Sequence, residues 1–303
     1  MFIQANDTRA AINAEPVRRP FIGLAPDLSK VSILTNRDRD EALSFLNLRP
    51  VHTVVMTSFI IDNGMESTLN RGEFYGYRNA EGTLEGVALI GHSTLVEARS
   101  DEALKAFAFT AKRSATPINL IMSDGEDALR FWNFFADGPR CPRLTCSELL
   151  FEVGFPFLVQ DCKWEIRNAN MDDLQQVAEA QAEVALIESG VDPMERDREG
   201  FLKRVARRIE QDRVFVATEN GKLVFKADII AETPETIYLE GVYVSEEYRG
   251  RNVGSGCLAK LSLDLLNRSQ NICLLSNISF SGAHKSFVKA GYRNTGHCTT
   301  LFV

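Results

Sequence analysis

The sequence predicts an α/β protein of two domains, on three observations. The chain has 303 residues, which is long for one small α/β domain and comfortable for two. Residues 164–303 read as strand, two helices, three strands, helix, strand, helix and strand. Residues 74–153 repeat the hairpin, helix, strand, helix, strand part of that order, which indicates an internal duplication.

The N-terminal half, residues 1–157, opens with about 30 residues that show no periodicity, and we expect a partly ordered extension there. Residues 51–61 are ambiguous. Their β-branched side chains favour a strand, whereas their position before a hairpin favours a helix. The hairpin itself is expected at 74–78 and 84–96, around the turn Ala80-Glu81-Gly82. Later elements are helices at 101–112 and 124–136 and strands at 118–122 and 144–153.

The C-terminal half, residues 164–303, begins with a short strand and two helices. Asn170 is expected to cap a helix over 171–187, because carboxylates follow it in the first turn. The run Gly190-Val191-Asp192-Pro193 ends this helix, and a second helix is expected over 195–211. The pair Asn220-Gly221 then predicts a hairpin. Strands are expected at 164–167, 214–218, 223–230, 237–244, 272–276 and 297–303, and further helices at 253–268 and 283–290.

Composition excludes several functional classes. The net charge of −7 argues against nucleic acid as a partner. No apolar run approaches the roughly 18 residues of a membrane span, and the N-terminus is too polar for a signal peptide. The six cysteines contain no C-x-x-C pair, so we expect reduced thiols in a cytoplasmic protein. His52, His92 and His297 lack partners at ligand spacing along the chain, and no metal site is expected.

The run V-Y-V-S-E-E-Y-R-G-R-N-V-G-S-G at 242–256 is the most informative part of the sequence. A β-branched strand ends in a loop that contains Arg249, Gly250 and Arg251, and helical periodicity follows. Backbone N–H groups converge where such a loop enters a helix, and the helix dipole favours negative charge there. Guanidinium groups add charges that pair with phosphates. The pattern therefore predicts a phosphate site, with a plain strand–helix corner as the alternative.

This run resembles the pyrophosphate loop of the GNAT superfamily of acyl-CoA-dependent N-acyltransferases, whose pattern is R/Q-x-x-G-x-G/A. Arg249 fills the first position and Gly254 the last. Asn252 stands where the middle glycine is usual, and asparagine is the residue that best tolerates a positive φ in its place. The element order of residues 164–303 is also that of a GNAT domain.

The resemblance implies a mixed sheet, flanked by helices, that splays between the strand ending at Val244 and the strand at 272–276. Acyl-CoA, normally acetyl-CoA, lies in the split, and the amine approaches from the other side. Backbone groups near Val244 serve the thioester carbonyl and the pantetheine amides, and Asn277 resembles an asparagine that contacts the pantetheine arm. The residues implied in cofactor binding are Val242, Tyr243, Val244, Arg249, Gly250, Arg251, Asn252, Val253, Gly254, Ser255 and Asn277.

Amide formation from a thioester requires loss of a proton from the amine and stabilisation of the oxyanion. Glu240 lies two residues before Val242 and is the candidate base, with a solvated strand carboxylate as the alternative. The family's usual acid is the tyrosine of Y-x-x-x-G-F/Y. Here the segment is F-V-K-A-G-Y, and Phe287 cannot donate a proton. The other candidates for the acid are His284, Ser286, Cys298 and Tyr243. His284 is favoured because imidazole titrates near neutrality. Alternatively His284 only touches CoA, and the thiolate leaves without an acid.

The N-terminal half lacks such a phosphate loop. The corresponding segment at 97–102 has no glycine and three carboxylates, which repel a pyrophosphate. We therefore expect a degenerate GNAT-like domain over 1–157 and an acyl-CoA-binding GNAT domain over 164–303. The expected reaction moves an acetyl group from acetyl-CoA to an amine of a small molecule or peptide. Alternatives are a CoA-binding regulatory or interaction protein without turnover, and a small-molecule acetyltransferase resembling mycothiol synthase, which also has tandem domains.

Overall fold

The computed structural model of the chain describes residues 25–158 and 161–303, which fall into two compact units. The N-terminal unit comprises the described residues up to Glu148 together with His297–Val303, and the C-terminal unit comprises the described residues of Leu149–Gly296. Two strands, β6 (Leu144–Val153) and β12 (Arg293–Phe302), therefore divide between the units. The expected division into 1–157 and 164–303 did not include this exchange of strands. Most of the expected N-terminal extension lies outside the described residues.

The sheet of the N-terminal unit has the strand order β1-β2-β3-β4-β5-β12. Its other strands are β1 (Val31–Ile33), β2 (Gly72–Arg78), β3 (Leu84–Gly91), β4 (Ser93–Ala98) and β5 (Leu120–Asp124). Neighbouring strands are antiparallel except β4 and β5, which run parallel. The sheet is therefore mixed, and its parallel pair is joined through a helix, as parallel strands require.

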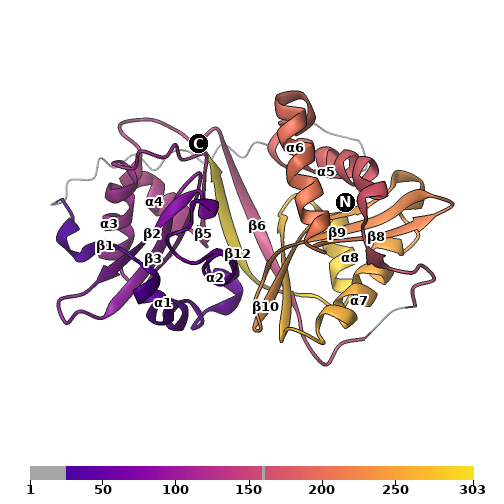
Figure 1. Cartoon of the computed structure of the whole chain (residues 1–303), viewed down its shortest axis with the longest axis horizontal. Coiled ribbons are helices and arrows are strands. Elements are labelled where there is room, and N and C mark those ends of the chain that lie inside the picture. Colours follow the sequence, from indigo (N-terminus) through magenta and orange to yellow (C-terminus); the bar gives the residue numbers. More distant parts are fainter. Residues whose placement is uncertain (1–24, 159–160) are drawn as a thin grey trace. The chain divides into compact units, whose positions relative to one another are not determined.

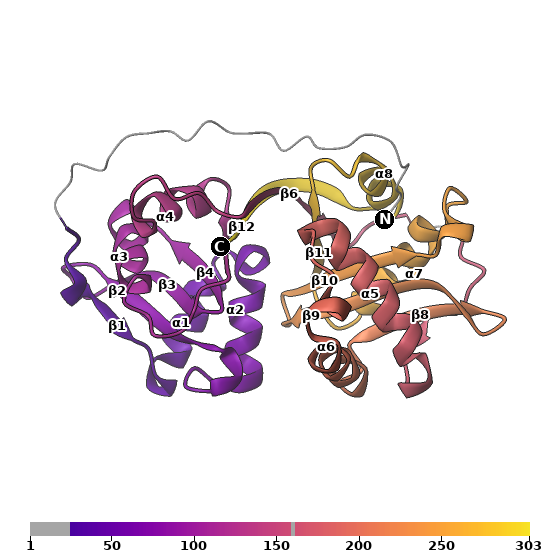
Figure 2. The ribbon, with the colours of Figure 1, turned by 90° about the horizontal axis from the view of Figure 1, so that it is seen from above.

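Helices cover both faces of this sheet (Figures 1 and 2). The helices α1 (Arg39–Leu46) and α2 (Pro50–Asn63) pack on one face, and α3 (Asp101–Ala111) and α4 (Asp127–Phe135) on the other. The ambiguous segment 51–61 is thus helical: Pro50 occupies its first turn and Gly64, with φ 76°, ends it. The helix expected at 124–136 begins later, because Asp124 ends strand β5.

The C-terminal unit has the strand order β6-β11-β10-β9-β8-β7. The strands are β7 (Arg167–Asn168), β8 (Val214–Glu219), β9 (Lys222–Glu232), β10 (Thr236–Val244) and β11 (Asn271–Asn277). The helices are α5 (Leu174–Ser189), α6 (Pro193–Glu210), α7 (Val253–Leu265) and α8 (Ser281–Lys289). Residues of α5 and α6 form one apolar cluster with the sheet, and residues of α7 and α8 form another. Short 3₁₀ turns occur at Leu28–Lys30, Asn36–Asp38, Thr68–Asn70, Met171–Asp173 and Glu246–Tyr248.

Local signals explain several of these elements. The Asn170 side chain accepts from the Asp172 amide, and a reciprocal capping box with Asp173 starts the first helical segment. Asn220 and Gly221 both have positive φ, 54° and 76°, as a two-residue hairpin turn of this type requires. The strand expected at 164–167 is shorter than predicted: the Trp164 carbonyl accepts from the Lys260 ammonium at 2.9 Å, and the strand begins only at Arg167.

The exchanged strand β6 completes the larger core of the C-terminal unit. Phe151 and Val153 are 1% and 3% exposed and belong to the same apolar cluster as α7 and α8. Phe151 lies edge-on to Phe287 of α8, with ring centroids 5.5 Å apart. A segment that sequence reasoning places in the N-terminal half thus supplies core residues to the C-terminal unit. None of the helices in the described part of the chain is long and apolar enough to cross a membrane.

Candidate functional site

The candidate site begins where two parallel strands of the C-terminal unit separate. Strands β10 and β11 pair from Thr236–Asn271 to Leu239–Leu274. Pairing ends there, although β10 continues to Val244 and β11 to Asn277. The expected splay is therefore present, at the carboxyl ends of two parallel strands, where α/β proteins commonly bind ligands.

A β-bulge distorts β10 within the splay. Glu240 pairs with Asp228 and Tyr243 with Lys226, so β10 advances by one residue more than β9. Gly241 sits in the bulge with φ 59°. A Cβ there would lie 2.6 Å from the Gln181 side-chain oxygen and 2.7 Å from the Lys226 ammonium, so both the backbone angle and the close packing require glycine.

Buried polar side chains pack against the bulge and form hydrogen bonds with it. The ammonium of Lys226 is fully buried, donates to the Gln181 side chain at 2.6 Å and to the Gly241 carbonyl at 3.3 Å, and pairs with Asp228 at 2.8 Å. Burial lowers the pKa of Lys226, and the charge of Asp228 opposes this shift. Arg208 from α6 also reaches Asp228, at 3.4 Å. This network fixes the course of β10 next to Glu240.

The loop between β10 and α7, which the sequence predicts to bind phosphate, has the positive φ values that its glycine and asparagine allow. Gly250 and Asn252 have φ values of 76° and 59°, both left-handed. Asn252 precedes the first residue of α7 and makes no side-chain capping bond to the helix amides; its oxygen instead accepts from Lys289 at 3.1 Å. The first N–H groups of a helix lack acceptors within the helix, and no side-chain cap at Asn252 covers them here. The start of α7, with Val253 and Gly254, is therefore suited to an anion.

The two loop arginines differ in their surroundings. Arg249 is mostly buried, donates from Nε to the Val244 carbonyl, and pairs through Nη2 with Glu183 of α5, both at 2.9 Å. It also lies over the ring of Tyr243, whose hydroxyl donates to the same Glu183. Arg251 is exposed at the loop. Arg249 thus fixes the loop against α5, while Arg251 extends positive charge toward solvent beside the start of α7.

The corresponding helix of the N-terminal unit starts in a different way. The Ser100 side chain accepts from the Ala103 amide and caps α3. Asp101 and Glu102 occupy the first turn, and Arg130 pairs with Asp101. A capped helix start with carboxylates in its first turn does not suit a phosphate. That the segment at 97–102 binds no pyrophosphate stays a prediction.

Glu240 lies beside the bulge and is exposed to solvent. Its Oε1 accepts from the Tyr238 hydroxyl at 2.7 Å, because residues two apart on a strand share a face. The carboxylate is therefore accessible and held by one hydrogen bond, as an acceptor-side base requires. The alternative, a solvated strand carboxylate, has the same geometry.

The two remaining candidates, His284 and Asn277, lie in α8 and at the end of β11. The His284 Nε2 contacts the Asn277 carbonyl at 3.0 Å, so this nitrogen must hold a hydrogen and donate it. Burial lowers the pKa of His284, and the hydrogen bond that the ring donates to the Asn277 carbonyl partly opposes this. The ring is therefore neutral at neutral pH and is a poor acid. The side-chain oxygen of Asn277 accepts from the amide and the hydroxyl of Ser279 within the same turn. Phe287, at the position of the family's usual tyrosine, is a core residue and is 7% exposed.

The structure gathers most of the predicted cofactor residues at one place, the end of β10, the loop and the start of α7. Ser255 is buried, and its hydroxyl donates to the Asn252 carbonyl at 3.0 Å, so it supports the turn. Sequence reasoning missed Glu183, Lys226 and Asp228. A signal was present for the last two: they lie two residues apart in the otherwise apolar strand L-V-F-K-A-D-I-I, which places both on one face.

Comparisons with known proteins identify this architecture. Residues 210–296 match the family model described as acetyltransferase (GNAT) domain. The comparison with curated protein sequences gave no match. Among solved structures, a Drosophila protein aligns with a TM-score of 0.65 at 11% identity, covering 90% of this chain and 98% of that one.

Two further structures are described as GNAT proteins. An acetyltransferase of the GNAT family from Colwellia psychrerythraea has a TM-score of 0.52 at 14% identity, with 90% of this chain and 98% of that one covered. A tandem GNAT protein from the clavulanic acid biosynthesis pathway, determined without acetyl-CoA, has a TM-score of 0.53 at 11% identity, with 90% and 97% covered. The chain therefore has the fold of the GNAT acyl-CoA N-acyltransferases, and residues 210–296 match the model of the GNAT acetyltransferase domain.

Proposed function

We propose that the C-terminal unit transfers an acetyl group from acetyl-CoA to an amine. The observation that supports this most strongly is the contrast between the two helix starts. Helix α7 begins without a side-chain cap beside exposed Arg251, whereas α3 is capped by Ser100 and bears carboxylates. Only one of the two related units thus suits a pyrophosphate, and we expect one acetyl-CoA per chain.

In the proposed complex the pantetheine arm lies in the splay between β10 and β11, with the thioester near the bulge. Glu240 accepts a proton from the amine, directly or through a water molecule. Attack on the thioester carbonyl forms the amide bond and breaks the carbon–sulfur bond. The thiolate leaves without a strong acid nearby, because Phe287 has no hydroxyl and His284 is neutral.

The test of turnover is release of free CoA from acetyl-CoA in the presence of a panel of amines and thiols. Glu240→Gln keeps the shape of the side chain and removes the base, so the maximal rate should fall about 10²–10⁴-fold while acetyl-CoA affinity stays unchanged. Glu235→Gln, in the turn before β10, is the matched control. Full activity of Glu240→Gln contradicts the assignment of the base.

The alternative function, CoA binding without turnover, is favoured by one observation: the position of the family's usual tyrosine is a packed phenylalanine. The same assay separates the two functions. Binding of acetyl-CoA with no CoA release from any member of the panel supports the regulatory alternative, and release that depends on the acceptor supports the transferase.

A further inference from the structure

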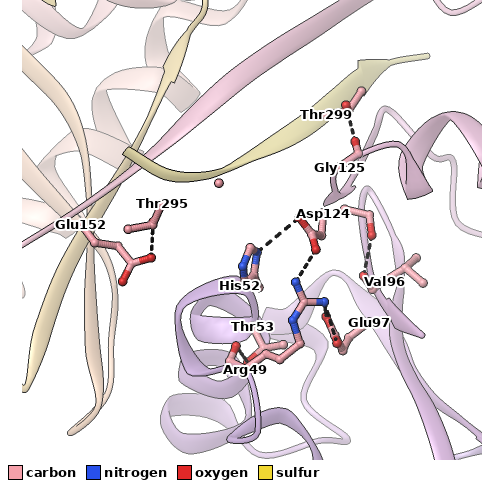
Figure 3. A network of polar contacts seen from close by, with 12 residues as sticks. Arg49, His52, Thr53, Val96, Glu97, Asp124, Gly125, Glu152, Thr295 and Thr299 are labelled. Atoms are coloured by element: carbon pink, nitrogen blue, oxygen red, sulfur yellow. Dashed lines mark hydrogen bonds and ion pairs between the residues drawn. The ribbon is translucent and has the colours of Figure 1, made fainter. Parts of the chain in front are cut away.

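A second cluster of reactive side chains lies in the N-terminal unit, and none of its residues belongs to the proposed acyl-CoA site. His52 comes from α2, Asp124 from the end of β5 and Cys298 from β12. One possible ligand atom from each residue lies within 4.8 Å of the other two. Cys298 and Asp124 are direct partners in the β5–β12 ladder, and the His52 Nδ1 lies 3.7 Å from the Asp124 Oδ1 (Figure 3).

The three donor types together favour a particular class of cation. Thiolate and imidazole suit borderline transition-metal dications, with Zn²⁺ the commonest, and a carboxylate oxygen completes sets of this kind. The hard cations Mg²⁺ and Ca²⁺ prefer all-oxygen sites, and a thiol argues against them. Three protein ligands leave a fourth tetrahedral position for water or another ligand.

The carboxylate of Asp124 is already oriented by a second residue. Arg49, which precedes α2, donates from Nη2 to the Asp124 Oδ2 and contacts both oxygens of Glu97 through Nη1, at 3.2 and 3.3 Å (Figure 3). The Oδ1 atom is the one that faces His52. A ligating carboxylate commonly accepts such a hydrogen bond on its other oxygen, which fixes its orientation.

Charge also favours a dication at this place. Glu97 is 6% exposed, and Asp124 is half-buried beside it. With a Cys298 thiolate as ligand, three negative groups face the positive charge of Arg49, and Arg99 also acts on Glu97. Glu148 adds a further negative charge near Cys298. A bound dication cancels the excess, and burial makes such compensation necessary.

We propose that the N-terminal unit binds one Zn²⁺-class ion through His52, Asp124 and Cys298. The site joins helix α2 to the paired strands β5 and β12. Because His297–Val303 is the segment that this unit receives from the end of the sequence, the ion fastens the exchanged strand to a helix of the unit.

The test is a titration of the full-length, dialysed protein with Co²⁺ under a non-thiol reductant, followed by Zn²⁺. Four-coordinate Co²⁺ with one thiolate gives intense visible bands and a near-ultraviolet thiolate-to-metal band, which Zn²⁺ should abolish by displacement. We expect one ion per chain. Cys298→Ser should remove the thiolate band and weaken binding by about 100-fold or more, since even changes outside the ligand set cost about 10–100-fold.

Matched controls separate this site from incidental binding. Cys141→Ser removes an exposed thiol of the same unit, and His92→Gln removes a histidine whose Nδ1 contacts Asn119 at 3.0 Å. Both should bind Co²⁺ as the wild type does, whereas His52→Gln should not. Zn²⁺ should raise the melting temperature of the wild type and of both controls. A wild type without a thiolate band, or a band that persists in Cys298→Ser, overturns the proposal even if one variant fails to fold.

Discussion

Asn252 is the residue on which the proposed phosphate loop depends most directly. It holds a left-handed conformation with φ 59°, and in that conformation its side chain leaves the start of α7 uncapped. Asn220 in the β8–β9 turn has nearly the same angle, φ 54°, far from the loop in sequence. The two residues offer a matched pair for separating backbone strain from ligand binding.

We predict that Asn252→Val and Asn220→Val each lower the free energy of unfolding by about 1–2 kcal/mol, because a β-branched residue is strained at positive φ. Only Asn252→Val should also lose acetyl-CoA affinity, whereas Asn252→Gly should keep it. Denaturant unfolding and calorimetry measure the two effects. Equal loss of affinity in both valine variants would contradict a specific role for the loop.

Lys226 carries a buried charge, and we expect its removal to lower the free energy of unfolding. Lys226→Met leaves the carboxylate of Asp228, 2% exposed, without its closest cation. We predict a loss of about 3–5 kcal/mol in the free energy of unfolding, the usual effect of removing one member of a buried pair. Lys203→Met is the control: its pair with Glu199 is exposed and on a helix, so about 0.5 kcal/mol or less is expected. Similar losses in both variants would show that burial of the Lys226 pair is unimportant.

At the scale of the element, the start of α5 predicts a dependence of stability on pH. Arg167 donates to both oxygens of Asp173, which also accepts from the Asn170 amide. These contacts hold the pKa of the Asp173 carboxyl below its ordinary value of 3.8, with the Arg167 hydrogen bond as the largest cause. The contribution is therefore fully present above the unfolded-state pKa near 3.8 and is lost as the pH falls through the lower folded-state pKa.

Asp173→Asn should lower the free energy of unfolding by about 2 kcal/mol at pH 6, from the lost charge-assisted bond and cap. The difference in the free energy of unfolding between this variant and the wild type should become smaller below pH 4. The control is Asp172→Asn, an exposed neighbour in the same turn, which affects only the helix dipole by about 0.3–1 kcal/mol. Urea unfolding at several pH values measures this. A gap between Asp173→Asn and wild type that widens at low pH would contradict the assignment.

The elements that local signals specify were predictable, and those that depend on distant contacts were not. Asn170, Asn220-Gly221 and the loop at 249–254 specify their structures through capping and positive φ, and the structure confirms these features. Residues 51–61 were ambiguous because apolar β-branched side chains suit both a strand and a buried helix; packing on the sheet settles it as α2. The cluster of His52, Asp124 and Cys298 joins three distant segments, so no spacing along the chain indicates it.

For the whole molecule, the exchange of β6 and β12 has the largest consequence. Sequence order suggests that the chain can be cut between 157 and 164. The structure instead gives Leu149–Val153 to the C-terminal unit and His297–Val303 to the N-terminal unit. Strand pairing of this kind is non-local and leaves no turn or periodicity signal, which is why the sequence does not reveal it.

We predict that a fragment 149–296 folds and binds acetyl-CoA, whereas a fragment 164–303 is much less stable. The second fragment lacks Phe151, and truncation of a buried aromatic residue alone costs about 3–5 kcal/mol of folding free energy. It also lacks strand β6, which is the neighbour of β11 in the sheet. Circular dichroism with thermal unfolding compares the two fragments. Equal stability would show that β6 is not part of this unit's core.

We propose that one of the two related units binds acyl-CoA, through the uncapped start of α7. Calorimetric titration of the whole chain with acetyl-CoA tests it most directly, in the wild type, in Arg251→Ala and in Arg99→Ala, the exposed arginine of the corresponding loop before α3. We predict one site per chain and a loss of about 1.5–2 kcal/mol in Arg251→Ala, the size of one charge-assisted contact, with wild-type affinity in Arg99→Ala. Two sites per chain, no binding, or equal effects of the two substitutions would contradict the claim.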